Sequence, residues 1–363
     1  MGERHVRIEI SDFVMRTFVL KKGVIMFHVK ILSKEDIMQV IEMQPVIQCV
    51  EEVYKLKSEG DTVVWPTTFY EFDPGHADMD IKSGYLKGAK VFGHKTVSWF
   101  GANKEKGLPD LVGVIVVFDA TNGLPIGILD GGYITGLRTG AAGAIGAKYL
   151  ARPESETLFV LGAGNQAAFQ IAAMLTLFPG LKKILVADML DPQNAERFIE
   201  ALPKRLAEEF GIDASGVTLE ANSKLEEAVP QADVIITVTP SKAPVIRKEW
   251  VRSGTHLSCI GADAEGKEEI DPEIYRGAVI FVDDMVHCVE AGETEIPLKK
   301  GIISREDIAG EIGDLILQKV PGRTSDEQIT IYDATGMALL DIAAGKAALD
   351  LAKNKNLGSD AVL

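Results

Sequence analysis

Residues 158–170, LFVLGAGNQAAFQ, decide the fold class of this 363-residue chain. They place Gly162, Gly164 and Ala167 in a G-x-G-x-x-A spacing, between a run that predicts a strand and a run that predicts a helix. In that setting the first glycine makes the tight turn, the second lets a pyrophosphate approach the backbone, and the alanine lets the helix pack closely. N–H groups at the start of the helix would bind the phosphates. The segment therefore predicts a dinucleotide-binding turn.

Asp188 supports this interpretation, because it ends the next predicted strand, KILVAD, at the expected distance of about 20 residues. An acid at this place accepts hydrogen bonds from the adenosine ribose hydroxyls and repels the 2′-phosphate of NADP. We therefore expect NAD as the cofactor. The alternative is an ordinary βαβ unit with a glycine loop and a surface aspartate, and the combination of strand, turn, helix and acid favours the cofactor site.

Strand-like and helix-like runs alternate on the C-terminal side of the turn. A helix is expected over 192–210, and strands over 217–221, 234–239, 256–261 and 279–283. This alternation indicates an α/β fold with a parallel, doubly wound sheet.

The pattern on the N-terminal side of the turn is different. Residues 32–57 have apolar side chains at helical spacing, which predicts one surface helix, with Ser33 as its N-cap and Asp36 three positions later. Short apolar runs between residues 60 and 130 are separated by Gly, Pro, Asn and Asp, which predicts an antiparallel sheet. Residues 139–150 predict a tightly packed helix that bridges two domains, and we expect a last helix over 341–354 to pack back on the first domain.

Two domains follow, of which the first is discontinuous in sequence. We assign residues 1–150 and 338–363 to one domain, and residues 151–337 to the dinucleotide-binding domain with the Rossmann pattern.

Composition excludes several classes of protein. The net charge of −15 is spread over both halves without a basic face, which argues against a nucleic-acid partner. The apolar runs are too short to span a bilayer, and residues 1–22 alternate charged with apolar side chains, so we expect no membrane association and a cytoplasmic location. Cys49, Cys259 and Cys288 lack C-x-x-C spacing, so neither a disulfide framework nor a metal site is expected.

Three charged residues are candidates for the chemistry of a hydride-transfer enzyme. Such an enzyme needs a cation for a substrate carboxylate and a proton carrier beside the reacting carbon. Lys95 and Arg138 are the candidate cations, and Asp263 follows a predicted parallel strand, where ligands of doubly wound sheets bind. A partly desolvated Asp263 with a raised pKa could carry a proton at neutral pH. The alternative for each is a solvated surface lysine, a salt-bridged arginine or a turn aspartate.

Six segments in order, from about Lys82 to the C-terminus, resemble the ornithine cyclodeaminase and mu-crystallin family. They are GHKTVSWFGANKEKGLP, GILDGGYITGLRTGAAGAIGAKYLA, LGAGNQA, ADVIITVTP, IGADAEGKEEID and GRTSDEQITIYDATGMALLD. The resemblance implies an NAD-binding Rossmann domain and a discontinuous α+β domain for substrate binding and dimerisation. Members include ornithine cyclodeaminases, archaeal-type alanine dehydrogenases, ketimine reductases, and a crystallin that serves as a lens and hormone-binding protein.

The resemblance also implies roles for individual residues. Lys95 and Arg138 take the positions that bind the substrate carboxylate, Arg138 also touches the cofactor, and Asp263 takes the position of the catalytic proton donor or acceptor. Thr335 would approach the substrate. The positions that match the family's cofactor site, besides Gly162 and Gly164, are Asn165, Gln166, Asp188, Thr239, Ile260, Gly261, Ala262, Asp263, Lys267 and Ala334.

The sequence departs from the family pattern at one carboxylate-binding position. Many relatives carry a P-x-R element whose arginine also binds the carboxylate, whereas this chain has Pro66, Thr67 and Thr68 there, and D-I-K-S-G-Y replaces an M-P element. A lost bidentate arginine contact is worth about 2 kcal/mol. Either Lys82 or Lys87 compensates, or the substrate differs from ornithine and alanine.

The sequence therefore predicts an NAD(H)-dependent oxidoreductase or cyclodeaminase that acts at the C–N bond of a small amino or imino acid. Lys95 and Asp263 are the expected catalytic residues. The resemblance implies a homodimer or a higher homo-oligomer. The alternatives are an imine or ketimine reductase on an unusual substrate, such as an opine-like or aminated dicarboxylic acid, and a non-catalytic binding protein like the crystallin; a proton carrier at Asp263 speaks against the last.

Overall fold

The computed structural model describes residues 18–21 and 24–363, so most of the segment 1–22 considered above lies outside the described residues. The chain forms two compact units. The first contains the residues up to Ile41, together with Gly60–Ile134 and Asp341–Leu363, and the second contains Glu42–Glu59 and Thr135–Leu340. The first unit is thus discontinuous, and the chain passes between the units four times.

The unit boundaries differ from the predicted domain boundaries mainly in two helices, and by three residues at the start of α10 (Ala338–Lys355). Helix α2 (Met43–Ser58) belongs to the second unit because it packs against α4 (Asn165–Leu177) and α9 (Ile312–Ile316). Helix α3 (Gly131–Leu150) passes from the first unit to the second after Ile134. The assignment of substrate binding to one unit and NAD binding to the other stays a prediction.

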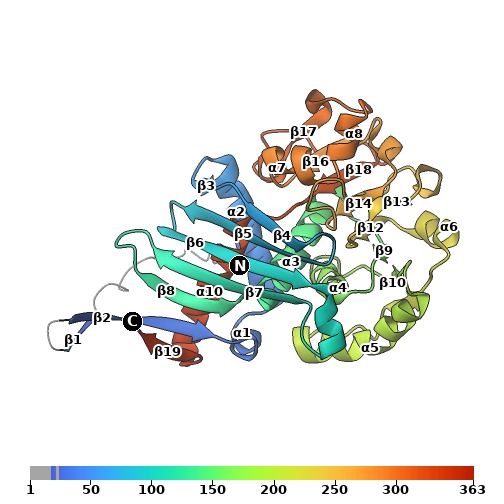
Figure 1. The fold of residues 1–363 in the computed structure, drawn as a ribbon. Coiled ribbons are helices and arrows are strands. Elements are labelled where there is room, and N and C mark those ends of the chain that lie inside the picture. Colours follow the sequence, from blue (N-terminus) through green and yellow to red (C-terminus); the bar gives the residue numbers. More distant parts are fainter. Residues whose placement is uncertain (1–17, 22–23) are drawn as a thin grey trace, which may run out of the picture. The chain divides into compact units, whose positions relative to one another are not determined.

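The first unit is built on a nine-stranded sheet (Figure 1). Its central order is β1-β2-β8-β7-β6-β5-β3, with β19 beside β2 and β4 beside β5. All pairs are antiparallel except β2 and β8, which confirms the antiparallel sheet predicted between residues 60 and 130. The strands are β1 (Phe18–Lys21), β2 (Val24–Leu32), β3 (Thr62–Val64), β4 (Thr68–Asp73), β5 (Ala77–Leu86), β6 (Val91–Phe100), β7 (Leu111–Asp119), β8 (Pro125–Asp130) and β19 (Ser359–Val362).

The two faces of this sheet have different surroundings. Helix α10 (Ala338–Lys355) covers the inner face so closely that a Cβ on Gly127 would lie 2.3 Å from Leu349, and Gly345 lies beside Ile115 and Leu129. The last helix therefore packs back on the first domain, as expected. The opposite, outer face exposes apolar side chains, which include Tyr70, Phe72, Phe100, Val112 and Val114.

The single helix predicted over 32–57 is wrong, because two helices cover this stretch. Ser33 and Asp36 form the expected capping box at the start of α1 (Lys34–Val40). The helix ends at Ile41, which has an extended backbone with φ −128°. Pro45 explains the break, since in a continuous helix it would lack the N–H that bonds to Ile41 and its ring would clash with the Ile41 carbonyl. In α2 the proline occupies the first turn, where it is tolerated.

The second unit contains the predicted parallel sheet. Its eight strands have the order β11-β10-β9-β12-β14-β18-β16-β17, and every pair is parallel. The strand order reverses between β9 and β12, which is where doubly wound sheets bind ligands. The strands are β9 (Thr157–Leu161), β10 (Lys183–Ala187), β11 (Thr218–Ala221), β12 (Val234–Thr237), β14 (His256–Cys259), β16 (Val279–Val282), β17 (Ile308–Glu311) and β18 (Thr330–Asp333).

Close packing of α3 explains its many small residues. The helix starts at Gly131, eight residues before the predicted start at residue 139. A Cβ on Gly140 would lie 2.5 Å from the backbone oxygen of Phe169 in α4. Helix α4 thus lies directly against α3, and α5 (Pro192–Phe210) matches its predicted range.

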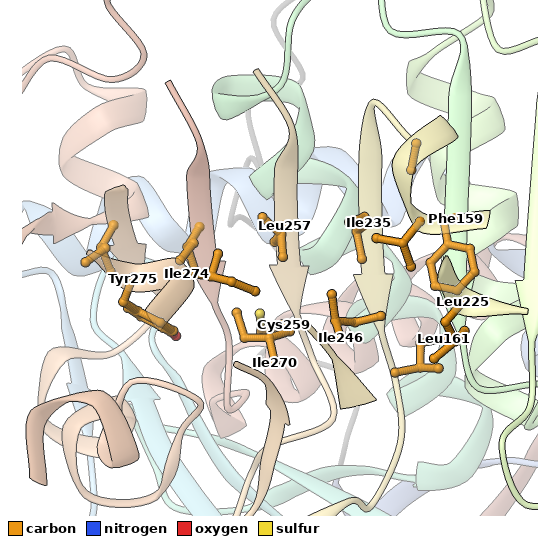
Figure 2. Close-up of a cluster of buried hydrophobic side chains, with 14 of the residues drawn as sticks. Phe159, Leu161, Leu225, Ile235, Ile246, Leu257, Cys259, Ile270, Ile274 and Tyr275 are labelled. Carbon is orange, nitrogen blue, oxygen red and sulfur yellow. The ribbon is translucent and has the colours of Figure 1, made fainter. Parts of the chain in front are cut away.

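A buried apolar cluster fills one face of the parallel sheet (Figure 2). Side chains from neighbouring strands, among them Phe159, Ile235 and Leu257, pack with Ile246 and Ile270 of the small parallel pair β13 (Lys242–Ile246) and β15 (Glu268–Ile270). Each fully buried side chain of this size contributes about 1.5–3 kcal/mol to folding. This cluster fixes the sheet whose strand ends carry the candidate site.

Several short elements were not predicted from the sequence. They are η1 (Gly101–Lys106), α6 (Leu225–Ala228), η2 (Val229–Gln231), η3 (Lys248–Trp250), η4 (Pro272–Tyr275), α7 (Met285–Ala291), α8 (Glu295–Lys299) and η5 (Arg305–Asp307). Among the residues that the structure describes, no helix has the length and apolar character needed to cross a membrane.

Candidate active site

The glycine turn after β9 has the geometry that its sequence predicts. Gly162 has φ +107°, and a Cβ there would lie 2.9 Å from the carbonyl oxygen of Val238 on the next loop. At Gly164 an added Cβ would meet no described atom within 4 Å. Helix α4 starts directly after Gly164, and Ala167 in its first turn is fully buried. The turn therefore offers accessible backbone at the start of a buried helix.

Asp188 follows the carboxyl end of β10, beside the glycine turn. Its carboxylate accepts hydrogen bonds from the backbone N–H groups of Leu190 and Asp191, at 3.0 and 3.2 Å. The side-chain amide of Asn194 donates to it at 2.8 Å and also to the carbonyl oxygen of Ala163, at 3.2 Å. Asn194 thus connects the acid to the turn, and the acid is held in one orientation.

The other predicted cofactor residues lie at the same edge of the sheet. Thr239 follows β12, the segment Ile260–Asp263 follows β14, and Ala334 and Thr335 follow β18. Strands β10, β9, β12, β14 and β18 are consecutive neighbours and parallel, so their carboxyl ends form one continuous edge. The structure therefore brings these residues, which are distant in sequence, to one edge.

A buried carboxylate that was not predicted from the sequence joins two of these strand ends, those of β12 and β14. Glu269 accepts hydrogen bonds from the hydroxyl of Thr237 at 2.7 Å, the N–H and hydroxyl of Thr239 at 2.6 and 2.7 Å, and the N–H of Gly261 at 2.9 Å. Burial raises the pKa of Glu269, while these four hydrogen bonds oppose the rise. The loops after β12 and β14 are thereby fixed to β15.

The loop that carries Asp263 is held at its far end as well. Gly266 donates its N–H to the buried carboxylate of Glu295 at 2.8 Å. Asp263 itself forms an ion pair with Lys267, with 2.5 Å between Oδ1 and Nζ. The Asp263 side chain is 48% exposed, so its predicted desolvation and role as a proton carrier stay predictions.

Two further buried acids lie at the carboxyl ends of the neighbouring strands β16 and β18. Asp283 accepts hydrogen bonds from the N–H of Thr335 at 3.2 Å and the N–H of Gly336 at 2.7 Å. Asp333 accepts from the N–H and hydroxyl of Thr294, at 2.9 and 2.6 Å. Burial raises the pKa of Asp333 to about 7, although the bonds from Thr294 lower it.

Arg138 on α3 is buried and lies against the same loop, because a Cβ on Gly336 would be 2.5 Å from its Nη1 atom. The side chain of Gln166 donates to the carbonyl oxygen of Gly136, two residues before Arg138 on α3, at 3.3 Å. Arg138, Thr335 and the start of α4 are thus connected within the second unit.

Lys95 lies in the first unit, on β6. It is 2% exposed, and its Nζ atom lies 3.3 and 3.2 Å from the two carboxylate oxygens of Asp341 on α10. The structure thus shows a buried, ion-paired lysine rather than a solvated surface lysine.

A protein-family model described as "Ornithine cyclodeaminase/mu-crystallin family" matches residues 28–356. The chain belongs to this family. The sequence resemblance is therefore confirmed, and it extends further toward the N-terminus than the six segments do.

Relatives of known activity cover nearly the whole chain. The alanine dehydrogenase of Archaeoglobus fulgidus is 37% identical over 329 residues, which are 91% of this chain and 97% of that protein. An archaeal alanine dehydrogenase dimer with bound NAD superposes with a TM-score of 0.84 at 35% identity, over 92% of this chain and 99% of that one. The Δ1-pyrroline-2-carboxylate reductase of Thermococcus litoralis, in complex with NADH and L-proline, gives 0.84 at 29% identity, over 91% and 99%.

The sequence indicated the positions of two of the buried acids that hold the site together. Asp283 directly follows an apolar run, and Asp333 is the last residue of a β-strand, positions that lie at the ligand edge of a parallel sheet. Glu269 had no such signal, because it acts through its place on β15 beside two other strand ends. Among residues 18–21 and 24–363, no group of three or more His, Cys, Asp or Glu side chains could hold a metal ion.

Asp333 predicts a pH dependence of stability. Its pKa is raised from 3.8 to about 7, so the folded protein binds the proton more tightly than the unfolded chain does. The stabilisation is complete below 3.8 and is lost as the pH rises through about 7. We expect the free energy of unfolding of the wild type to fall relative to Asp333→Asn by roughly 1 kcal/mol per pH unit over this interval. Urea denaturation at several pH values measures this difference, and a difference independent of pH contradicts the prediction.

Proposed function

We propose that this protein is an NAD(H)-dependent oxidoreductase or cyclodeaminase that acts at the C–N bond of a small amino or imino acid. The observation that carries the proposal is the set of adjacent strand ends, which unites the glycine turn with Asp188, Thr239, Asp263 and Thr335. The activities of the relatives, an alanine dehydrogenase and a pyrroline-carboxylate reductase, support it.

NAD(H) is the proposed cofactor. The open backbone at Gly164 suits a pyrophosphate, and the fixed carboxylate of Asp188 suits the ribose hydroxyls and disfavours a 2′-phosphate. The residues proposed to hold the remainder of the cofactor are Arg138, Gly162, Asn165, Gln166, Thr239, Ile260, Gly261, Ala262, Asp263, Lys267 and Ala334. When bound, the cofactor accepts or donates a hydride.

The chain's own charged residues supply binding and proton transfer. Arg138 and Lys95 would bind the substrate carboxylate, and both are buried, which strengthens a charge-assisted hydrogen bond. Asp263 would take the proton from the substrate nitrogen or return it, and Lys267 beside it stabilises the ionised carboxylate. Thr335, held by Asp283, would contact the substrate.

A homodimer is the proposed assembly. The outer face of the nine-stranded sheet exposes the apolar side chains of Tyr70, Phe72, Phe100, Val112 and Val114, and contiguous exposed apolar groups mark protein interfaces. One related alanine dehydrogenase is a dimer.

All three cysteines are free, which supports the proposed cytoplasmic location.

The fate of the imine separates the candidate reactions. A panel of L-amino acids with NAD, and of keto acids with ammonia or amines and NADH, is followed by NADH absorbance and by ammonia release. A dehydrogenase accumulates NADH, a cyclodeaminase releases ammonia without net NADH, and an imine reductase consumes NADH. A protein that binds ligands with no turnover on the whole panel contradicts the proposed function.

The role of Asp188 predicts the choice of cofactor. NADPH would bring a phosphate dianion next to the carboxylate, so we expect its Kd to exceed that of NADH by about 100-fold. Fluorescence titration of the wild type and of Asp188→Ser measures both constants, and the variant should reduce the difference. Equal affinities of the wild type for the two nucleotides refute the assignment.

Asp263→Asn tests the proton carrier. We expect kcat to fall by about 10²- to 10⁴-fold while the Kd for NADH stays within a few-fold, because the amide cannot accept the proton. Asp213→Asn, at an exposed loop of the same unit, is the matched control. A variant at residue 263 that keeps normal turnover removes Asp263 from the mechanism.

A further inference from the structure

We propose that Lys82 is a second carboxylate-binding residue of the substrate site, and that it acts together with Lys95 on the α-carboxylate of the amino or imino acid. The inference rests on the proposed function and specifies how that site recognises its substrate.

Lys82 and Lys95 stand directly opposite each other in the sheet. The antiparallel register of β5 and β6 pairs residue 82 with residue 95. Side chains paired in this way project from the same face, with Cβ atoms about 5 Å apart. Both residues are buried, with 8% and 2% of their surface exposed. Two amino groups on adjacent strands are thus close enough to bind the two oxygens of one carboxylate.

The location of the pair is costly for folding, which points to a function. Lys82 and Lys95 share the inner face of the sheet with the fully buried Ile115, which is paired with Lys95 in the register of β6 and β7. Like charges directly opposite each other on a sheet are destabilising, and burial of an ammonium group adds to the cost. A stable core would have apolar residues at both positions.

Asp341 is part of the same arrangement. Its carboxylate lies 3.2 Å from the Nζ atom of Lys95, so the inner face already holds one acid that stabilises this cation. Asp80 lies on the same face two residues before Lys82. We infer that these acids hold the two lysine side chains in place, and that the substrate carboxylate binds to the two amino groups.

The structure also distinguishes Lys82 from Lys87, the other lysine considered for this role, and from Thr68, which stands where many relatives have the arginine. Lys87 is exposed in the turn between β5 and β6, where its Nζ donates to the carbonyl oxygen of Gly60 at 2.5 Å. Thr68 pairs with Ile81 and is exposed, and since adjacent residues of a strand point to opposite faces, it lies on the face away from Lys82. Lys82 is therefore the cation that accompanies Lys95.

The experiment compares a carboxylate with its uncharged amide. Isothermal titration calorimetry of the full-length protein with NADH measures the Kd of L-proline, L-prolinamide and L-aspartate for the wild type, Lys82→Met, Lys82→Arg and Lys87→Met. We expect Lys82→Met to weaken L-proline by about 10- to 100-fold, as for the loss of one charge-assisted hydrogen bond, and to leave L-prolinamide unchanged. Lys82→Arg should keep most of the affinity, and Lys87→Met should behave as the wild type.

Other outcomes overturn the inference. One is an unchanged Kd for L-proline in Lys82→Met. Another is an equal loss of affinity for L-proline and L-prolinamide, which indicates a structural role of Lys82. A third is a loss of affinity confined to L-aspartate, which indicates that Lys82 binds the side-chain carboxylate of the ligand. A wild type that does not distinguish L-proline from its amide overturns it too. Turnover is assayed separately. If the wild type turns over a substrate but Lys82→Met binds L-proline normally, only the role of Lys82 is refuted. If Lys82→Met weakens L-proline but not L-prolinamide and the wild type shows no turnover, only the proposed enzymatic function is refuted.

Discussion

The carboxyl ends of five neighbouring parallel strands meet at one edge of the second unit, and the candidate site depends on this constraint. Each strand delivers one loop, so residues between Gly162 and Thr335 reach the same edge without any long-range pairing of the loops themselves. The strands are fixed by apolar packing on their faces, as the cluster of Figure 2 shows. The loops are then free to carry polar residues.

Buried carboxylates give those loops defined positions. Glu269, Asp283 and Glu295 each accept backbone N–H groups from a loop that carries predicted site residues. A loop lacks the regular backbone hydrogen bonds of a helix or strand. Because a carboxylate can accept several hydrogen bonds at once, one buried acid supplies acceptors for several N–H groups of the loop. The cost is desolvation of the charge, which is visible in the raised pKa of Glu269. In return, the loops keep the site residues in position before the ligands bind, which favours a reaction that needs defined geometry.

Local pattern was sufficient to predict the features that depend on neighbours in sequence. The glycine turn, Asp188 and the helix at 192–210 follow from spacing over fewer than about 25 residues. The break at Ile41 was missed because the apolar period continues through it, and the position of Glu269 was missed because its partners are on other strands. Lys82 and Lys87 were equivalent candidates until the register of β5 and β6 showed which one is buried.

The discontinuity of the first unit has a consequence for the order of folding during synthesis. Strand β19 pairs with β2, and α10 covers the inner face of the sheet, yet β19 and all of α10 after Leu340 belong to the segment Asp341–Leu363. All residues of the second unit leave the ribosome before this segment does. We therefore expect the second unit to fold first, while the early strands wait with an uncovered apolar face and need protection from aggregation.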